Sequence, residues 1–347
     1  MNLLDVLVEW FLNSPIYKNE AYVAYYSTNK EGPVYPEITA YAISLCCILY
    51  ERRREPILLE RAETCAKHLK KINKNGAVPC FTDNLLYAFD TGIYISSMFD
   101  LYALTKEATY LEEAEKSLNW LLSLWDGKQF AAVNKIPEKN DWYHQPSVHL
   151  VKLVLPLMKA TTCLRDEKYS KTALELLERY KHLQTGEGGF QINESSRVIM
   201  THPHCYATEG FLYAYHISKK NKFLEIARKS SDWLCKAQNL DGSFYRCYNL
   251  GEKTEKRWRQ EMLKTSDATA QAIRIWKLLG VNQKGIEKAY KYLGSELKDN
   301  GLRLLKNDSL KSKLFSWRRE IYSWPTFFYI HSLLLPFGQI QYCKELF

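Results

Sequence analysis

No apolar run in the 347-residue chain approaches the ~20 residues that a helix needs to span a bilayer, so we expect no membrane span. The first stretch, MNLLDVLVEWFLNS, contains Asp5 and Glu9 and lacks a basic leader. We expect a helix of the fold there rather than a signal peptide or an anchor. The sequence also lacks a basic helix interleaved with aromatic residues, which nucleic-acid-binding proteins often carry, so no nucleic-acid partner is expected.

The nine cysteines include no CxxC pair, and their odd number fits no disulfide framework. Cys65, Cys163 and Cys235 fall on apolar faces of expected helices. This pattern predicts reduced, mostly buried thiols and a cytoplasmic protein. His204 and Cys205 are poorly spaced as two metal ligands, because adjacent side chains on a helix point about 100° apart. We expect no metal site and infer no cofactor.

Positive charge exceeds negative charge, with 48 Lys and Arg against 39 Asp and Glu, and the formal net charge is +9. The basic residues are spread along the chain. Such an excess fits either an acidic small-molecule substrate, such as a uronic acid, or simply a solvated surface. The fractions of hydrophobic residues (46%) and charged residues (25%) are those of a globular protein, and they leave the oligomeric state open.

Glycine-rich turns recur along the chain at intervals of about 50–60 residues, a period that holds two helices and two connections. The turns are NGAVPCF (75–81), WDGKQFA (125–131), TGEGGFQI (185–192), LDGSFYR (240–246) and DNGLRL (299–304). Their regular recurrence predicts a repeat architecture.

The segments between the turns alternate between two kinds of amphipathic pattern. Charged stretches with apolar residues at helical spacing precede the turns, and they predict outer helices at 56–73, 108–124, 167–183, 221–238 and 285–297. Less charged stretches rich in Ala, Gly, Ser and Tyr predict inner helices at 37–50, 90–104, 146–160, 205–217, 267–279 and 324–335.

A helix near residues 2–13 supplies a sixth outer helix, beside the last inner one. The pattern therefore predicts an all-α fold, an (α/α)6 barrel of six inner and six outer helices that occupies residues 1–347 as a single domain.

This organisation resembles the six-hairpin (α/α)6-toroid superfamily, which includes glycoside hydrolases, polysaccharide lyases and sugar epimerases. AQNLDGSF (237–244) is similar to the loop repeats of squalene-type cyclases, which belong to the related toroid of terpenoid cyclases and protein prenyltransferases. YPEITAY (35–41) and KTSDATAQAIRIW (264–276) resemble segments of bacterial and archaeal barrel proteins tied to surface-polysaccharide pathways. The resemblance implies a toroid that acts on carbohydrates.

In such a ring the N-termini of the inner helices share one face, where their dipoles favour anionic or hydroxyl-rich ligands. Polar residues gather at those ends of the sequence. They are Glu37 and Thr39; Asp90 and Thr91; Gln145, Ser147 and His149; His202, His204, Tyr206 and Glu209; Asp267, Thr269 and Gln271; and Tyr322 and Trp324.

We expect Glu209 and Asp267 to act as acid and base, with His204 and Tyr206 assisting proton transfer. The expected substrate-binding residues are Asp90, Gln271, Trp142, Trp324, Glu37, His202, Gln145 and Tyr322, with the tryptophans as stacking surfaces and Asp90 and Gln271 as hydroxyl ligands. Structural readings stay open, since Asp90 and Asp267 could cap helices and Glu209 could form a buried hydrogen bond.

RVIMTHPHCYATEG (197–210) predicts an extended approach to the fourth inner helix. We expect His202 in the approach loop, Pro203 before the helix, and His204 near the N-cap and directed at the mouth of the barrel. Arginines near this mouth could clamp a carboxylate or could simply be solvated. They are Arg197, Arg257, Arg259, Arg318 and Arg319.

Several functions remain open from the sequence. Glycoside hydrolysis requires two carboxyl groups, whereas elimination or epimerisation at a uronic acid requires a base beside a cationic group. A non-catalytic toroid that binds a glycan or a protein would keep the aromatic residues. A terpenoid cyclase is disfavoured because SDATAQ offers one aspartate, and a prenyltransferase because Thr269 stands where a zinc-binding cysteine would be required. We therefore expect a carbohydrate substrate.

Overall fold

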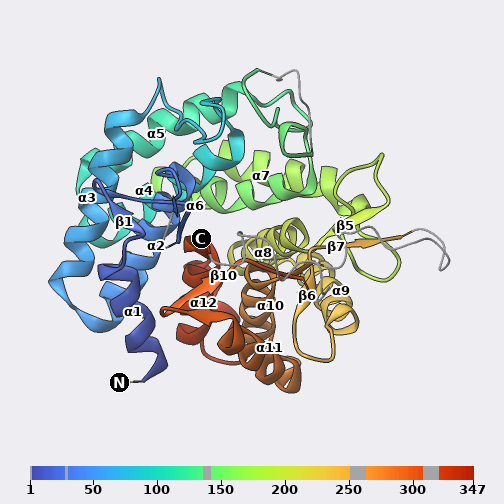
Figure 1. Ribbon diagram of the computed structural model, residues 1–347. Helices are drawn as coiled ribbons and strands as arrows, with labels where there is room; N and C mark the ends of the chain where they lie inside the picture. The colour runs from blue at the N-terminus through green and yellow to red at the C-terminus, as the bar shows by residue number, and fades with distance from the viewer. Residues whose placement is uncertain (1, 28–29, 136–141, 251–262, 308–319) are drawn as a thin grey trace.

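The computed structural model describes residues 2–27, 30–135, 142–250, 263–307 and 320–347, and of residues 142, 306 and 307 the backbone alone. Within these ranges the chain forms twelve α-helices, which confirms the all-α (α/α)6 barrel (Figure 1). The inner helices are α2 (Pro36–Arg53), α4 (Ala88–Thr105), α6 (Val154–Leu164), α8 (Thr201–Ser218), α10 (Ser266–Leu279) and α12 (Ser323–Leu334). The outer helices are α1 (Leu3–Asn13), α3 (Pro56–Ile72), α5 (Ala108–Ser123), α7 (Glu167–Tyr180), α9 (Asn221–Ala237) and α11 (Gln283–Glu296).

The inner helices form a closed ring. Each contacts the next one, and α12 contacts both α2 and α1, so the two ends of the chain meet. The outer helices bury only one stripe, as α7 does with Leu176 and Tyr180, because their other face is charged and solvated. Along α8, in contrast, almost every side chain between Thr201 and Ala214 is buried, since the helix packs on both the ring and α9.

The third inner segment departs from its expected helix. Residues Val148–Leu153 form a 3₁₀ helix, η2, and the α-helix α6 begins only at Val154. Pro156 explains the change, because proline has no N–H to donate and fits only in the first turn of an α-helix. Both His149 and Lys152 of η2 are buried.

The glycine-rich turns repeat in structure as well as in sequence. Gly188 and Gly242 have φ values of 103° and 92°, and a Cβ at either glycine would lie within 2.2 Å of a backbone oxygen of the next outer helix. In both turns a glutamine side chain bridges the turn to that helix. Gln184 donates to the carbonyls of Gly188 and Ile226, and Gln238 donates to those of Gly242 and Gly285.

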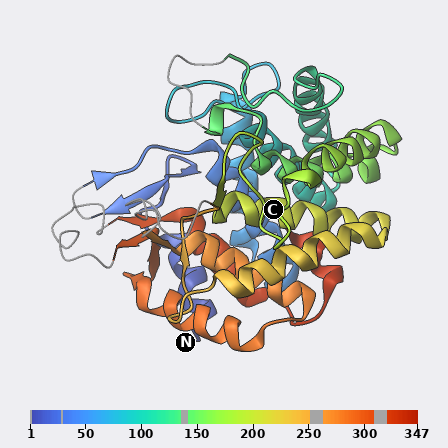
Figure 2. The same cartoon turned by 90° about the vertical axis from the view of Figure 1, so that its right-hand side faces the viewer.

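Short strands that the sequence analysis did not predict lie at the N-terminal ends of the inner helices. A five-stranded sheet has the order β4 (Lys30–Glu31), β3 (Tyr25–Ser27), β12 (Ile321–Tyr322), β10 (Gly301–Arg303), β9 (Leu297–Lys298). It joins the first and last parts of the chain, seen as blue strands beside red and orange ones in Figure 2. Three smaller sheets complete the set. One has the order β11 (Leu305–Asn307), β8 (Leu263–Thr265), β6 (Phe244–Tyr245), and the others pair β5 (Val198–Met200) with β7 (Cys247–Asn249) and β1 (Tyr17–Lys18) with β2 (Ala21–Tyr22).

The opposite end of the barrel is closed by the 3₁₀ helix η6 (Ile340–Glu345) and the two residues after it, Leu346 and Phe347, which are buried. This segment packs against α8 and α10. The nine cysteines are all free. Among the residues that the structure describes, no helix combines the length and apolar character needed to cross a membrane.

Close packing between inner helices predicts a specific mutational effect. A Cβ at Gly210 of α8 would lie 2.5 Å from the carbonyl oxygen of Val151 in η2, so Gly210→Ala must push two backbones apart. We expect a loss of about 1–3 kcal/mol in the free energy of unfolding, measured by urea denaturation. Gly294→Ala in the outer helix α11 is the matched control. Its Cβ would meet nothing within 4 Å, and an alanine there should stabilise by about 0.5–1 kcal/mol. Equal effects of the two changes would contradict the packing described.

Candidate functional site

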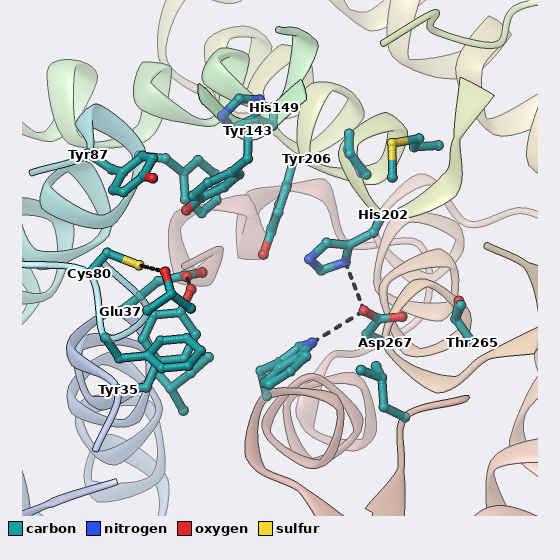
Figure 3. Close-up of a pocket in the computed structure, with 18 of the residues that line it drawn as sticks. Tyr35, Glu37, Cys80, Tyr87, Tyr143, His149, His202, Tyr206, Thr265 and Asp267 are labelled. Carbon is teal, nitrogen blue, oxygen red and sulfur yellow. Dashed lines mark hydrogen bonds and ion pairs between the residues drawn. The ribbon is translucent and has the colours of Figure 1, made fainter. Parts of the chain in front are cut away.

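A cavity of about 720 Å³ opens at the end of the barrel where the inner helices begin. Five of the expected site residues line it: Glu37, His202, Tyr206, Asp267 and Trp324. Figure 3 shows two groups of side chains that face each other across this space. Tyr35 and Glu37 belong to one wall, His202 and Asp267 to the other, and Tyr206 lies between them.

The first wall is built on the start of α2. Tyr35 precedes Pro36 and is held in an extended conformation, so that the helix begins at Pro36 and Glu37 falls in its first turn. The Tyr35 hydroxyl donates a hydrogen bond to Glu37 Oε2. Burial, and then the neighbouring Asp90, raise the pKa of the Glu37 carboxyl well above its ordinary value, which favours its protonated form.

Asp90, in the first turn of α4, lies behind this wall rather than in the cavity lining. It is fully buried, and Tyr143, which lines the cavity, donates a hydrogen bond to its Oδ1. Burial raises the pKa of Asp90 to about 7. Asp90 was expected to bind substrate hydroxyls, but in the structure it accepts a hydrogen bond from Tyr143 and holds that lining side chain in place.

The raised pKa of Asp90 predicts how stability changes with pH. Between about pH 4 and 7 the folded protein keeps a proton on Asp90 that the unfolded chain has lost, so this contribution to stability falls as pH rises. Asp90→Asn keeps an oxygen that can accept from Tyr143 but does not titrate. The difference in free energy of unfolding, variant minus wild type, should therefore increase from pH 4 to pH 7, as measured by urea denaturation. Asp232→Asn, at an exposed position of α9, is the matched control, and a change with pH for Asp90→Asn no larger than that of the control would refute the assignment.

The second wall is a hydrogen-bonded group on α8, α10 and α12. His202 Nδ1 lies 2.6 Å from Gln271 Oε1 and 3.5 Å from Asp267 Oδ2. Both partners are oxygen acceptors, which places the imidazole proton on Nδ1 and leaves the lone pair on Nε2. That second ring nitrogen faces the cavity (Figure 3). Burial lowers the pKa of His202, so the neutral ring is favoured.

Asp267 is held by donors on its other side. Its Oδ1 accepts from the backbone N–H of Ala268 at 2.7 Å, and its Oδ2 accepts from Trp324 Nε1 at 3.2 Å. Gln271, one turn further along α10, is fully buried and does not line the cavity. Gln271 contacts His202 and orients its ring. Because Gln271 does not line the cavity, the structure does not place it where it could bind substrate, contrary to our expectation.

The start of α8 corrects the expected approach loop. The helix begins at Thr201, with Met200 as its N-cap, so His202 is already helical and Pro203 stands in the first turn. Proline is tolerated there because the N–H groups of the first turn have no partner within the helix. His202, Tyr206 and Glu209 then follow one face at positions i, i+4 and i+7, and this face points into the barrel.

His204 lies on another face of α8, and the expectation that it points at the mouth is wrong. Its Nδ1 accepts from the Phe190 amide at 3.0 Å, its Nε2 lies 3.3 Å from Ser230 Oγ on α9, and its ring packs on Trp233. Burial lowers the pKa of His204 to about 3. This histidine joins α8 to the outer layer and has no contact with the cavity.

Glu209 lies on the inward face but below the cavity, so it is not among the lining residues. It is fully buried between two cations that are buried as well: Lys152 Nζ lies 2.5 Å from its Oε2 and Arg274 Nη2 lies 3.4 Å from its Oε1. Burial lowers the pKa of Lys152 to about 8. This placement favours a structural role for Glu209, as the partner of two buried cations, over a role in catalysis.

Tyr206 forms the floor between the cavity and these charges. Its hydroxyl accepts from Tyr41 at 3.0 Å, and Lys152 Nζ lies 5.3 Å from its ring centroid. The His202 ring packs edge-on against it at 4.3 Å. Burial raises the pKa of Tyr206 well above its ordinary value, so its hydroxyl is a proton donor.

The other expected residues either do not line the cavity or lie outside the part of the chain that the structure describes. Gln145 lines a separate surface hollow beside Arg179. Tyr322 is in β12, donates to Glu320 and packs on Tyr25. The side chain of Trp142 lies outside the described residues, as do Arg257, Arg259, Arg318 and Arg319. Arg197 is exposed and does not line the cavity.

Sequence reasoning missed the lining residue Arg246 and the buried cations. Arg246 lines the cavity from the bend between β6 and β7, whose direction the helical pattern does not reveal. Lys152 and Arg274 did carry a signal, since each is a charged residue inside an otherwise apolar inner-helix pattern, in VHLVKLVLP and AQAIRIW. Such a residue needs a buried partner of opposite charge.

The sequence matches no protein-family model and none of the curated proteins. Solved structures do match the fold over most of the chain. A sugar epimerase from a ruminal bacterium is 10% identical and has a TM-score of 0.75, with 96% of this chain and 99% of that one covered. The chain has the six-hairpin (α/α)6-toroid fold. Two further toroids are the cellobiose 2-epimerase of Bacillus thermoamylovorans B4167 (9% identity, TM-score 0.77, 95% and 98% covered) and an unsaturated glucuronyl hydrolase of Bacillus sp. GL1 (13%, 0.68, 95% and 94%).

Proposed function

We propose that this toroid is a carbohydrate-active enzyme that transforms an acidic sugar of an oligosaccharide or polysaccharide by acid–base chemistry. One observation carries the proposal. Across a single cavity, the buried carboxyl of Glu37, whose raised pKa favours its protonated form, faces the cavity-directed Nε2 of a neutral His202. A proton donor and a proton acceptor on opposite walls suit a reaction that moves protons on two faces of one ring.

The roles follow from the contacts of each group. His202 is the base, because its tautomer leaves Nε2 free for a proton, and Asp267 stabilises the imidazolium that forms. Glu37 is the acid, with Tyr35 fixing its orientation. Tyr206 on the floor is a second proton donor, since its hydroxyl oxygen already accepts from Tyr41 and its own proton remains available.

A sugar fits the size and lining of the cavity. A volume of about 720 Å³ is within the usual range for small-molecule sites. Tyr35, Tyr87, Tyr143 and Trp324 contribute aromatic surface, which packs on the apolar faces of sugar rings. The similar solved structures are described as a sugar epimerase, a cellobiose epimerase and a glucuronyl hydrolase, which supports the same substrate class.

Epimerisation or elimination is the reaction that the arrangement favours. Asp267 is engaged by Ala268, Trp324 and His202, whereas Glu37 faces His202 from the opposite wall, where its raised pKa favours the protonated form of a general acid. Inverting hydrolysis is the second candidate, because Asp267 and Glu37 line the same cavity and that reaction needs two carboxyl groups.

Reaction products in heavy water separate these outcomes. The protein is incubated with acidic and neutral oligosaccharides, and products are analysed by NMR and mass spectrometry. Epimerisation places solvent deuterium on the inverted carbon, elimination creates a carbon–carbon double bond, and either supports the proposal. New reducing ends without carbon-bound deuterium support the hydrolytic candidate. Sugar binding with no reaction in any sample would identify a non-catalytic glycan-binding toroid and refute the enzyme.

A further inference from the structure

Arg246 lies between β6 and β7 and lines the cavity. Its backbone is fixed on both sides: its N–H donates to the carbonyl of Leu263 at 2.7 Å, and its carbonyl accepts from the N–H of Thr201 at 3.0 Å. Thr201 begins α8, which carries His202, and Leu263 begins the strand that leads into α10, which carries Asp267. The backbone of Arg246 is thus tied to the segments that begin α8 and lead into α10, the two helices that carry His202 and Asp267.

The charge of Arg246 is not neutralised within the described part of the chain. Arg246 is the one Lys or Arg among the described lining residues, and none of their carboxylates forms an ion pair with it. The carboxylates that share the cavity are engaged elsewhere: Asp267 with Trp324 and Ala268, and Asp83 with the Tyr87 hydroxyl at 2.7 Å. A half-buried guanidinium in this setting is a site for a carboxylate, which it can hold through two parallel hydrogen bonds.

Buried cations below Tyr206 also favour a negatively charged ligand in the cavity. Lys152 and Arg274 share the one carboxylate of Glu209, so two positive charges face a single negative charge. All three side chains are fully buried, where electrostatic interactions are weakly screened. Arg274 Nη2 also donates to the Phe347 oxygen at 3.5 Å, whereas Lys152 Nζ lies 5.3 Å from the Tyr206 ring centroid, so Lys152 is the cation that lies directly beneath the floor.

We propose that Arg246 is a specificity-determining residue that binds the carboxylate of a uronate sugar in the cavity. This inference rests on the proposed function. With its carboxylate on Arg246, the sugar presents the adjacent carbon beside His202. His202 Nε2 takes the proton from that carbon, and the electron pair of the broken C–H bond moves into the carboxylate, where Arg246 stabilises the added charge. Glu37 then returns a proton to the opposite face of the carbon, and solvent restores both groups.

Matched sugar pairs test the proposal on the intact protein. The pairs are glucuronate with glucose, galacturonate with galactose and mannuronate with mannose, whose members differ only in the carboxylate. Binding is measured by calorimetry and saturation-transfer NMR at low and high salt. We expect a uronate to bind at least about tenfold more tightly than its neutral partner, as hydrogen bonds to a charged group imply, and the preference to shrink in high salt.

Substitutions show whether Arg246 is the residue that causes the preference for a uronate over its neutral partner. Arg246→Gln should remove the preference for the uronate and leave affinity for the neutral sugar unchanged, and Arg246→Lys should retain part of it. Arg228→Gln, an exposed site on α9, should behave as the wild type. A uronate preference that survives in Arg246→Gln, or equal wild-type affinities for the two members of every pair, would overturn the role of Arg246 and leave the carbohydrate enzyme standing. Absence of binding and of turnover for every sugar would overturn the proposed function as well.

Discussion

Glu37→Gln is expected to lower turnover by about 10²–10⁴-fold, the usual contribution of a positioned general acid. The amide keeps the shape of the side chain and can accept from Tyr35, but it has no acidic proton to give. Sugar binding should therefore change little while turnover falls. Because the raised pKa of Glu37 sets the point at which the acid is lost, the wild-type rate should decline on the alkaline side of its optimum.

Two companion variants make this result specific. His202→Gln should cause a loss of similar size, since it removes the base from the opposite wall. Glu51→Gln makes the same change on the same helix, α2, at its exposed far end, and should retain wild-type turnover. The rates are measured with the sugar that reacts in heavy water. Wild-type rates in Glu37→Gln would remove this residue from the mechanism.

Glu209→Gln is expected to reduce the free energy of unfolding by about 3–5 kcal/mol, the usual cost of removing one partner of a buried ion pair. The change leaves Lys152 and Arg274 both fully buried without a counter-charge. Urea denaturation at pH 7 measures the effect. Glu112→Gln, at an exposed position of the outer helix α5, should stay within about 0.5 kcal/mol of the wild type.

The same variant separates the structural and catalytic readings of Glu209. Because this carboxylate does not line the cavity, the fraction of Glu209→Gln that remains folded should keep turning over substrate. A large loss of turnover in a variant as stable as the wild type would restore Glu209 as the acid, as the sequence first suggested.

Most of the fold was predictable because helical periodicity and glycine turns are local signals. The outer helices α3, α5 and α9 end within a residue of their expected limits, since each pairs a charged face with an apolar one. The third inner helix was harder. The apolar run from Val148 looks helical throughout, and only Pro156 indicated that its first part is wound differently.

The site was less predictable, because it depends on which face of each inner helix points into the barrel. Placing the start of α8 four residues too late put His202 in a loop and made His204 appear directed at the mouth. With the helix beginning at Thr201, the inward face carries His202, Tyr206 and Glu209, and His204 turns toward α9. Depth along the barrel then separates Tyr206, which lines the cavity, from Glu209, which lies below it, and sequence spacing alone does not give that depth.

A crystal structure with a reacting sugar or its product bound shows directly whether Glu37 and His202 act on opposite faces of one sugar ring. We expect a sugar ring between the two walls, with one face within hydrogen-bond reach of the Glu37 carboxyl and the other beside His202 Nε2. A sugar that instead occupies the surface hollow near Gln145, or that lies in the cavity with both Glu37 and His202 out of reach, would contradict this expectation.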